Sequence, residues 1–267
     1  MSGAVDGADP ARIGRYELLE QLGSGGMATV YRARMQGFAR ATKFVAVKLI
    51  HASLGHNRDF VLMFLDEMRV TMALAHRNIV QTFDAGKFAD RYYMVMELIE
   101  GCSLRGLLAS LGHRAPFPLE LGLHIGMEIC SALSHAHGLS APASDEPAGV
   151  VHRDVSPSNI LLSAQGDVKL ADFGVARAAG RLGVSSSDLI KGKLSYMAPE
   201  QARGEAPPRS DIYAVGAVLY EVLCGQPHRR LRDLKSVSRG EGPAPPGSLR
   251  PELSASLAEL MVRTLRP

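Results

Sequence analysis

Short runs of apolar and β-branched residues dominate the first third of the chain, and longer apolar stretches with helical spacing dominate the rest. Between Tyr16 and about Ile99, four runs are typical of strands: RYELLEQLG, ATVYRAR, KFVAVKLI and YYMVMELI. One helical stretch interrupts them, and its apolar positions between Phe60 and Leu74 form a stripe. From Ser103 onward helical patterns prevail, broken by short strands at NILLS and VKLA.

This change of pattern predicts an α+β protein with two lobes and a ligand-binding cleft between them. We expect a small, β-rich N-lobe over about 16–97 with one main helix, a hinge at about 97–101, and a larger, mostly helical C-lobe over about 102–267. Residues 1–15 are expected to form a flexible N-terminal segment.

Composition and charge exclude several classes of protein. The chain has 267 residues, 46% of them hydrophobic, and a net charge of +3, which gives no argument for a nucleic acid or a membrane surface as partner. The start, MSGAVDGADPARIGR, lacks the apolar core of a signal peptide, and no apolar run is long enough to span a bilayer. We therefore expect a cytoplasmic location, with Cys102, Cys130 and Cys224 as buried free thiols.

A glycine-rich stretch, LGSGGMATVY, lies between two predicted strands. Glycines at 23, 25 and 26 let backbone N–H groups approach phosphate oxygens closely. Ala28 replaces the third glycine of G-x-G-x-x-G, and a strand pattern follows instead of the helix that a dinucleotide-binding fold requires. By itself such a stretch is more often a simple turn.

Lys48 lies in the apolar run VAVK, where alternation alone leaves a solvated position open. Glu67 falls in the middle of the apolar stripe of the following helix. A buried carboxylate needs a partner, because removing one partner of a buried ion pair costs about 3–5 kcal/mol. The two positions predict a Lys48 to Glu67 ion pair.

Six motifs follow one another in the chain: GSGGMATV, VAVK, the helix glutamate, HRDVSPSN, DFG and APE. In order and spacing they resemble those of the protein kinases, most closely the bacterial, eukaryotic-like (Hanks-type) serine/threonine kinases. The resemblance covers about Tyr16 to Pro267 and implies the two-lobed kinase fold with ATP in the cleft.

The resemblance also implies a role for each matching residue. Asp154 would accept the proton of the attacking hydroxyl, and Asn159 and Asp172 would hold Mg²⁺. Lys48, steadied by Glu67, would grip the α and β phosphates. The nucleotide would contact the glycine-rich loop, an apolar sandwich, backbone groups at the hinge and the residue at the back of the pocket: Leu22, Gly23, Ser24, Gly25, Gly26, Met27, Ala28, Thr29, Val30, Ala46, Leu161, Glu97, Ile99 and Met96.

Two departures from the family pattern concern the transferred phosphoryl group. Ser156 stands where serine/threonine kinases usually carry a lysine, and Lys193 stands where they usually carry a threonine after a glycine. We hypothesise one exchange, in which Lys193 supplies the cation missing at Ser156. The alternative is that Lys193 points to solvent and Ser156 tolerates slower chemistry.

Four further positions carry expectations from the resemblance. Ser185, Ser186 and Ser187 are predicted autophosphorylation sites, whose phosphate would pair with Arg153; a plain linker is the alternative. At the start of a buried helix, Asp211 is either a helix cap or an anchor for the backbone of the 152–154 loop.

The C-terminal end is expected to be truncated. In the family Glu200 pairs with an arginine of a late helix, and the chain stops at LMVRTLRP, before that helix. We therefore expect Glu200 to lack its usual partner and a longer parent protein, in which an anchor beyond Pro267 is possible.

Three functions are compatible with these motifs. A serine/threonine protein kinase that uses ATP and Mg²⁺ is the leading one, because Lys48, Glu67, Asp154, Asn159 and Asp172 are all present. A nucleotide-binding pseudokinase scaffold is the alternative suggested by Ser156. A small-molecule phosphotransferase of the aminoglycoside-kinase type is disfavoured by the APE segment, the glycine-rich loop and DFG.

Overall fold

The computed structural model describes residues 9–37, 41–112, 117–139, 149–173, 195–228 and 244–266, except for the side chains of Asp59, Met63, Asp66, Glu67 and Ala202. The chain divides into two compact units. The first consists of Met1–Met68 and Gln81–Leu98, and the second of Arg69–Val80 and Ile99–Pro267. The division between Leu98 and Ile99 falls within the stretch predicted as a hinge.

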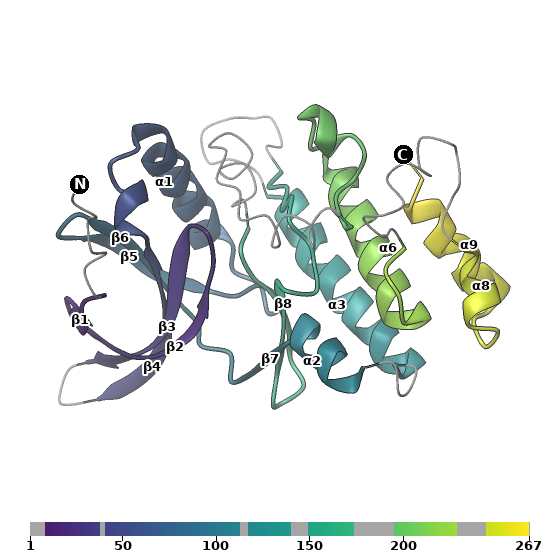
Figure 1. Cartoon of the computed structure of the whole chain (residues 1–267), viewed down its shortest axis with the longest axis horizontal. Coiled ribbons are helices and arrows are strands. Elements are labelled where there is room, and N and C mark those ends of the chain that lie inside the picture. Colours follow the sequence, from purple (N-terminus) through teal and green to yellow (C-terminus); the bar gives the residue numbers. More distant parts are fainter. Residues whose placement is uncertain are drawn as a thin grey trace, which may run out of the picture. The chain divides into compact units, whose positions relative to one another are not determined.

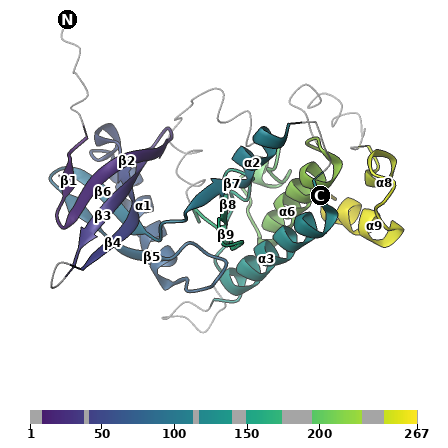
Figure 2. The ribbon, with the colours of Figure 1, turned by 90° about the horizontal axis from the view of Figure 1, so that it is seen from below.

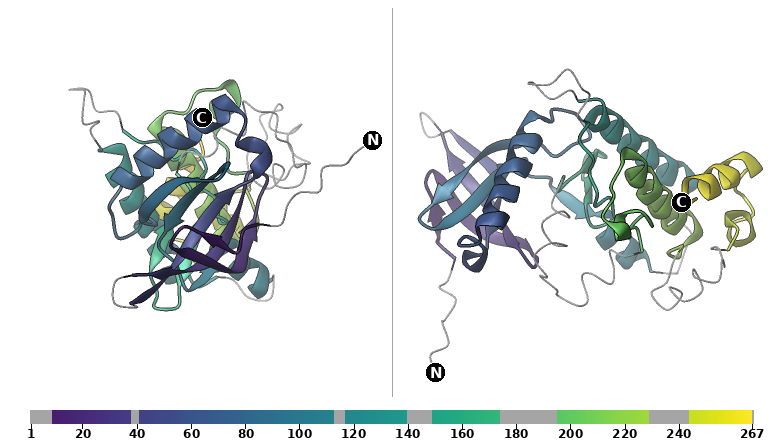
Figure 3. Two further views of the ribbon diagram at one scale, coloured as in Figure 1. Left: turned by 90° about the vertical axis from the view of Figure 1, so that its left-hand side faces the viewer. Right: turned by 90° about the horizontal axis from the view of Figure 1, so that it is seen from above.

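The first unit is built on one antiparallel sheet (Figure 1). Its order is β1-β2-β3-β4-β6-β5. The strands are β1 (Arg12–Ile13), β2 (Tyr16–Ser24), β3 (Ala28–Gln36), β4 (Thr42–Ile50), β5 (Thr82–Phe88) and β6 (Arg91–Met96). A short 3-10 helix, η2 (Ala52–Leu54), follows β4. The views in Figure 3 show this sheet strongly twisted, as expected because β-strands have a right-handed twist.

The sheet holds together through one apolar cluster, to which five strands contribute. Its members are Ile13, Tyr16, Ala33, Val45, Val47, Leu49 and Val95. In β4 every residue from Val45 to Ile50 is buried, so this strand is covered on both faces. The strand therefore shows no alternation of apolar and polar residues, as in the centre of a covered sheet.

The four predicted strands are present, and two further strands were not expected. Strand β1 pairs Ile13 with Tyr16 of β2, and the Ile13 side chain is fully buried. The expectation of a flexible segment over 1–15 is therefore wrong for Arg12–Ile13, because the apolar cluster of the sheet takes up Ile13. Strand β5 escaped prediction because its two phenylalanines, Phe83 and Phe88, are exposed.

The predicted helix is α1 (Arg58–Ala73), and its apolar stripe faces inward as expected. Phe60 and Phe64 are buried, and the ring of Phe64 meets that of Tyr92 of β6 edge-on, with centroids 5.9 Å apart. Within the first unit, this contact fixes the helix on the sheet.

The second unit is mostly helical, with a small sheet in the order β7-β8-β9 (Figure 2). Its strands are β7 (Gly101–Ser103), β8 (Ile160–Ser163) and β9 (Val168–Leu170). The helices and short helical turns are α2 (Leu104–Leu111), α3 (Leu119–His137), η3 (Gln201–Arg203), α6 (Pro208–Cys224), α8 (Pro246–Leu249) and α9 (Ala255–Thr264). The strands predicted at NILLS and VKLA are confirmed as β8 and β9.

Helices α3 and α6 lie side by side, and glycines make the contact close (Figure 2). A Cβ atom added at Gly122 would lie 2.6 Å from Cδ2 of Leu223, and one at Gly126 would lie 2.8 Å from Cδ2 of Leu219. Helix α6 is buried over most of its length and ends at Gly225, whose φ of 71° is the left-handed conformation of a C-cap.

The cysteines are free, as predicted, but they are less buried than expected. Cys102 and Cys130 are exposed and Cys224 is half-buried. Within the described ranges, no helix is both long enough and apolar enough to cross a bilayer.

Candidate functional site

The loop after α3 carries the predicted base, and a buried histidine organises it. The ring of His152 is fully buried. Its Nδ1 accepts a hydrogen bond from the Asp154 backbone N at 3.1 Å, and its Nε2 lies 3.0 Å from the carbonyl oxygen of Ala171. An amide donor on one side and a carbonyl acceptor on the other require the neutral ring with the proton on Nε2. Burial lowers the pKa of His152, against the opposing charges of Asp211 and Asp154.

The predicted base and the first predicted metal ligand are in direct contact. The side-chain amide of Asn159 donates from Nδ2 to Oδ2 of Asp154 at 3.0 Å and to the Asp154 carbonyl oxygen at 2.8 Å. The Asn159 backbone N donates to the carbonyl oxygen of Ser156 at 3.0 Å, which closes the loop as a turn. Because Nδ2 faces Asp154, the Oδ1 atom of Asn159 is the one that can serve as a metal ligand.

Asp211 anchors this loop, as one of the two readings of the sequence predicted. Its Oδ2 accepts from the backbone N of His152 at 2.8 Å and its Oδ1 from that of Arg153 at 2.7 Å. Nε2 of His137 lies 2.8 Å from the same Oδ2. The helix-cap reading is wrong, because Pro207 occupies the N-cap position of α6 and makes no side-chain cap.

The second predicted metal ligand follows β9. The backbone N of Ala171 donates to the carbonyl oxygen of Asn159 at 2.9 Å, which ties the end of this strand to the loop of the base. Asp172 has a φ of 63°, an unusual conformation for a residue other than glycine. Phe173 is buried, with its ring centroid 4.4 Å from that of His152.

These two ligands fit the donor set of Mg²⁺, a carboxylate and an amide oxygen. In the described part of the chain, no three His, Cys, Asp or Glu residues are grouped closely enough to hold a metal by themselves. An ion at Asn159 and Asp172 would therefore complete its coordination with oxygens from a nucleotide and water, which is how magnesium usually binds at phosphate sites.

Ser156, the first departure from the family pattern, is inside the loop and not at its surface. The residue is 2% exposed, and its buried hydroxyl oxygen has no hydrogen-bond partner among the residues that the structure describes. It provides no positive charge beside Asp154. The other half of the proposed exchange, Lys193, lies outside the described residues, and so do Ser185, Ser186 and Ser187.

The APE segment is coupled to the same loop by a residue that the sequence reasoning missed. The side chain of Gln201 accepts from the backbone N of Ala198 at 2.9 Å and donates to the carbonyl oxygen of Arg153 at 2.9 Å. The sequence contained a usable signal for this contact, because the side-chain amide of a glutamine directly after APE can both donate and accept hydrogen bonds.

Glu200 makes two contacts with described residues. The residue is 5% exposed, and its Oε1 accepts from the Ser210 hydroxyl at 3.0 Å and lies 3.5 Å from Nε of Arg209. The start of α6 supplies both contacts. Neither is with an arginine of a late helix, so the expectation that Glu200 lacks this usual partner stays a prediction.

In the first unit, Lys48 is buried and not solvated. It is 8% exposed and lies in β4 opposite Val30 of β3 and Met94 of β6. Glu67 belongs to α1, but its side chain lies outside the described part, so the ion pair with Lys48 remains a prediction. A buried ammonium needs a compensating charge, which keeps that prediction physically sound.

The glycine-rich stretch is the turn from β2 to β3. The backbone N of Gly25 donates to the carbonyl oxygen of Ala28 at 2.9 Å, and Ala28 and Thr29 are buried. A Cβ atom at Gly23 would meet nothing within 4 Å, and one at Gly25 would touch only the Ala28 oxygen at 3.9 Å. The protein itself therefore gives no steric reason for glycine at these two positions.

The residues predicted around the adenine fall into both units. In the first, Ala46 is buried and paired with Met96 across the β4–β6 ladder. The backbone N of Glu97 donates to the carbonyl oxygen of Gln81 at 2.8 Å. In the second, Leu161 lies in β8, paired with Ser103 of β7.

Known proteins place this arrangement in one family. The protein kinase domain family matches residues 16–241. The chain is 39% identical over 258 residues to the tyrosine-protein kinase MasK of Myxococcus xanthus, covering 94% of this chain and 40% of that protein. It is 40% identical over 212 residues to the serine/threonine-protein kinase PknL of Mycobacterium bovis, covering 79% of this chain and 49% of the relative.

A third relative and a solved structure agree. Identity to the serine/threonine-protein kinase PrkC of Bacillus subtilis is 37% over 214 residues, 80% of this chain and 31% of that protein. The crystal structure of the Mycobacterium tuberculosis PknI kinase domain matches with a TM-score of 0.71 and 26% identity, covering 98% of this chain and 91% of that one. The chain thus spans less than half the length of these three curated relatives, and it belongs to the protein kinase domain family.

Proposed function

We propose that this chain is the catalytic domain of a serine/threonine protein kinase, which transfers the γ-phosphoryl group of ATP to hydroxyl groups of proteins. The observation that carries the proposal is the contact between Asp154 and Asn159 in a loop anchored by Asp211. Relatives named as serine/threonine kinases support the same activity. The pseudokinase alternative gains no support from these names or from the site.

The chemistry assigned to this chain's residues is a direct displacement. The acceptor hydroxyl gives its proton to Asp154 while its oxygen attacks the γ-phosphorus, and the bond to the β–γ bridging oxygen breaks to release ADP. The hydrogen bond from Asn159 Nδ2 to Oδ2 holds the Asp154 carboxylate in one orientation for this proton. Bound at Asn159 Oδ1 and Asp172, Mg²⁺ would neutralise phosphate charge.

Nucleotide binding is assigned to residues from both units. The backbone N–H groups of residues 22–30 would approach the phosphates, and open space at Gly23 and Gly25 supports this, because added side chains would meet the ligand and not the protein. Lys48, paired with Glu67, would hold the α and β phosphates. Since the Glu97 N–H is engaged with Gln81, the adenine contact there falls to the Glu97 carbonyl, with Ile99 providing the N–H.

The cation for the transferred phosphoryl group is assigned to Lys193. The buried, uncharged Ser156 supports this assignment, because position 156 cannot supply that charge. Phosphoryl transfer gains most from fixed positive charge around the equatorial oxygens, so a replacement from elsewhere in the chain is needed.

Regulation is assigned to Ser185, Ser186 and Ser187. Phosphate added to one of them, with about 1.5–2 negative charges at neutral pH, would pair with Arg153. The left-handed backbone of Arg153, with φ of 69°, directs this arginine differently from an ordinary loop residue. We also assign the domain to the cytoplasm, where ATP and protein substrates are available and free thiols stay reduced.

Which hydroxyl group accepts the phosphate needs a separate test, because the relative MasK is named a tyrosine-protein kinase. Phosphate transfer from ATP and Mg²⁺ is measured on the chain itself and on three peptides that differ only in serine, threonine or tyrosine. We expect transfer to serine and threonine, abolished by Asp154→Asn and strongly reduced by Lys193→Ala. Transfer to tyrosine alone would overturn the assigned acceptor, and ATP binding without any transfer would establish the scaffold function instead.

A further inference from the structure

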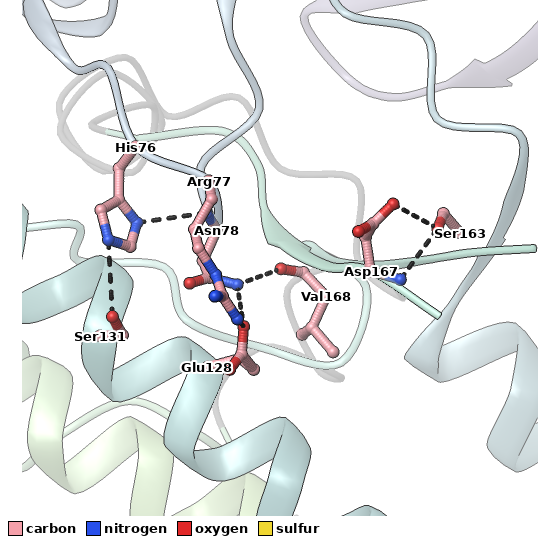
Figure 4. Close-up of polar contacts among 8 residues, drawn as sticks. All are labelled: His76, Arg77, Asn78, Glu128, Ser131, Ser163, Asp167 and Val168. Atoms are coloured by element: carbon pink, nitrogen blue, oxygen red, sulfur yellow. Dashed lines mark hydrogen bonds and ion pairs between the residues drawn. The ribbon is translucent and has the colours of Figure 1, made fainter. Parts of the chain in front are cut away.

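A buried asparagine joins three parts of the second unit (Figure 4). Asn78, in the loop that follows α1, is 3% exposed. Its Nδ2 donates to the carbonyl oxygen of Val168 at 2.9 Å and to Oε2 of Glu128 at 2.5 Å. One amide group therefore connects the loop, strand β9 and helix α3.

The backbone of the same loop extends the small sheet. The backbone N of Leu170 donates to the Asn78 carbonyl oxygen at 2.8 Å, and the backbone N of Val80 donates to the Leu170 carbonyl oxygen at 3.0 Å. Ile79 and Leu170 form a parallel bridge. Strand β9 is thus held on one edge by β8 and on the other by residues 78–80.

Strand β9 leads directly to Asp172, whose backbone is strained. A non-glycine residue at positive φ is unfavourable and persists only where its surroundings hold it in place. The two fixed edges of β9, together with the bond from Ala171 to Asn159, supply that restraint on the N-terminal side of Asp172.

Glu128 determines how the Asn78 amide is turned. Both partners of Nδ2, a carboxylate and a carbonyl, are acceptors only, so the nitrogen must face them. The Oδ1 atom is consequently buried without a hydrogen-bond partner among the described residues, which is unfavourable. Hydrogen bonds from Arg77 and Asn78 lower the pKa of Glu128, so the carboxylate is ionised at neutral pH and forms a charge-assisted bond.

We infer that Glu128 is a positioning residue for Asp172, acting through Asn78 and the register of β9. The inference rests on the proposed function in so far as Asp172 is taken as a metal ligand. Glu128 touches neither substrate nor nucleotide in this scheme. Glu128 fixes the orientation of the Asn78 amide, and this amide holds β9 in register. The position of β9 in turn determines the position of Asp172.

Arg77 offers a matched control. Its guanidinium donates to the same Glu128 Oε2 at 2.6 Å, but its side chain is 75% exposed. An exposed ion pair of this kind contributes little to stability. If the bond from Glu128 to Asn78 carries the effect, Arg77→Ala leaves β9 unchanged, whereas Glu128→Ala does not.

The test measures hydrogen exchange of single backbone amides in the full chain, without nucleotide. In Glu128→Ala we expect exchange at the Leu170 and Val80 amides at least tenfold faster than in the wild type, while the Val150 amide, which donates to Ala136, is unchanged. Glu128→Gln, which retains an acceptor oxygen for Asn78, should lie near the wild type, and so should Arg77→Ala.

A second measurement connects the strand to the metal ligand. The Mg²⁺ concentration at half-maximal phosphate transfer should rise several-fold in Glu128→Ala, with a smaller change in rate at saturating Mg²⁺. Wild-type exchange at Leu170 in Glu128→Ala, or an equal effect of Arg77→Ala, would overturn the inference. If Glu128→Ala does not fold, Glu128→Leu, which fills the same space, replaces it with the same two outcomes. Absence of transfer in the wild type would overturn the proposed function alone, because the exchange measurement needs no activity.

Discussion

The Oδ1 atom of Asp211 accepts a hydrogen bond from the backbone N of Arg153 at 2.7 Å, and this bond holds a strained residue. Arg153 has a φ of 69°, a conformation that costs about 1–3 kcal/mol for a residue with a side chain. The residue that follows it is Asp154. The first turn of a buried helix thus determines the backbone from which the proposed base projects.

Asp211→Asn should therefore weaken both stability and transfer. An asparagine has only one acceptor oxygen, so either His152 N or Arg153 N loses its bond and faces an N–H group instead. We expect the free energy of unfolding to fall by about 2–4 kcal/mol, measured by urea denaturation. The control is Asp90→Asn, whose side chain is 80% exposed and whose stability should not change. A fully stable Asp211→Asn would show that the anchor contributes nothing.

Stability should fall when the pH is lowered through about 6.5, the ordinary pKa of histidine. Burial lowers the pKa of His152, so the folded chain binds this proton less readily than the unfolded chain and unfolding takes up a proton at lower pH. Stability from this group is fully present above pH 6.5 and is lost below it, at up to about 1.4 kcal/mol per pH unit. NMR of the imidazole resonances checks this directly: His152 should stay neutral at pH 6, and normal titration there would contradict the prediction.

Ser156→Ala should leave the fold intact and make it more stable. Within the described part of the chain the buried serine hydroxyl has no partner, and removing an unsatisfied buried group recovers about 1 kcal/mol. Thermal unfolding should show a higher Tm, while Ser158→Ala, at an exposed position of the same loop, should not. The transfer rate tests the role of the hydroxyl separately. A large loss of rate with unchanged stability would assign the hydroxyl to the phosphoryl group.

Gly101→Ala should destabilise the second unit. A Cβ atom at this position would lie 1.9 Å from the carbonyl oxygen of Leu162, so β7 and β8 would have to separate. Overpacking of this kind typically costs about 1–3 kcal/mol. Urea denaturation measures the loss, and an unchanged midpoint would mean that the two strands can move apart without penalty.

Gly23→Ala should leave stability unchanged and weaken nucleotide binding. No protein atom lies within 4 Å of the added Cβ, so stability should stay within about 0.5 kcal/mol of the wild type. If the loop binds phosphates through its backbone, the added methyl group lies where the nucleotide approaches, and the Kd for MgATP should rise several-fold. Titration with a fluorescent nucleotide decides this, since unchanged affinity would place the phosphates elsewhere.

The sequence predicted the elements that rest on local pattern. β-Branched runs gave four strands of the first sheet, and the apolar stripe gave α1, because both depend on residues close in the chain. Strand β5 was missed because Gly86 and two exposed phenylalanines obscure its alternation. The short strands β1 and β7 were missed because two or three residues carry no period.

Site residues that belong to one sequence motif were predicted. Contacts between residues that only the fold brings together were missed. Asp154 and Asn159 are five residues apart, and their contact is a property of one turn. The burial of Lys48 could not be read from alternation, because β4 is covered on both faces. The contact of Glu200 with Arg209, and that of Glu128 with Asn78, join elements that only tertiary packing brings together.

The exposed thiols make the second unit open to site-selective chemical labelling without any engineered cysteine. Cys102 in β7 and Cys130 in α3 are both accessible to a maleimide reagent. Cys224 is less reactive, because it is half-buried and burial raises its pKa to about 11. Burial also raises the pKa of Cys130, so Cys130 should react more slowly than its exposure alone suggests. One fluorophore at each exposed position would report by energy transfer how β7 and α3 move when nucleotide binds.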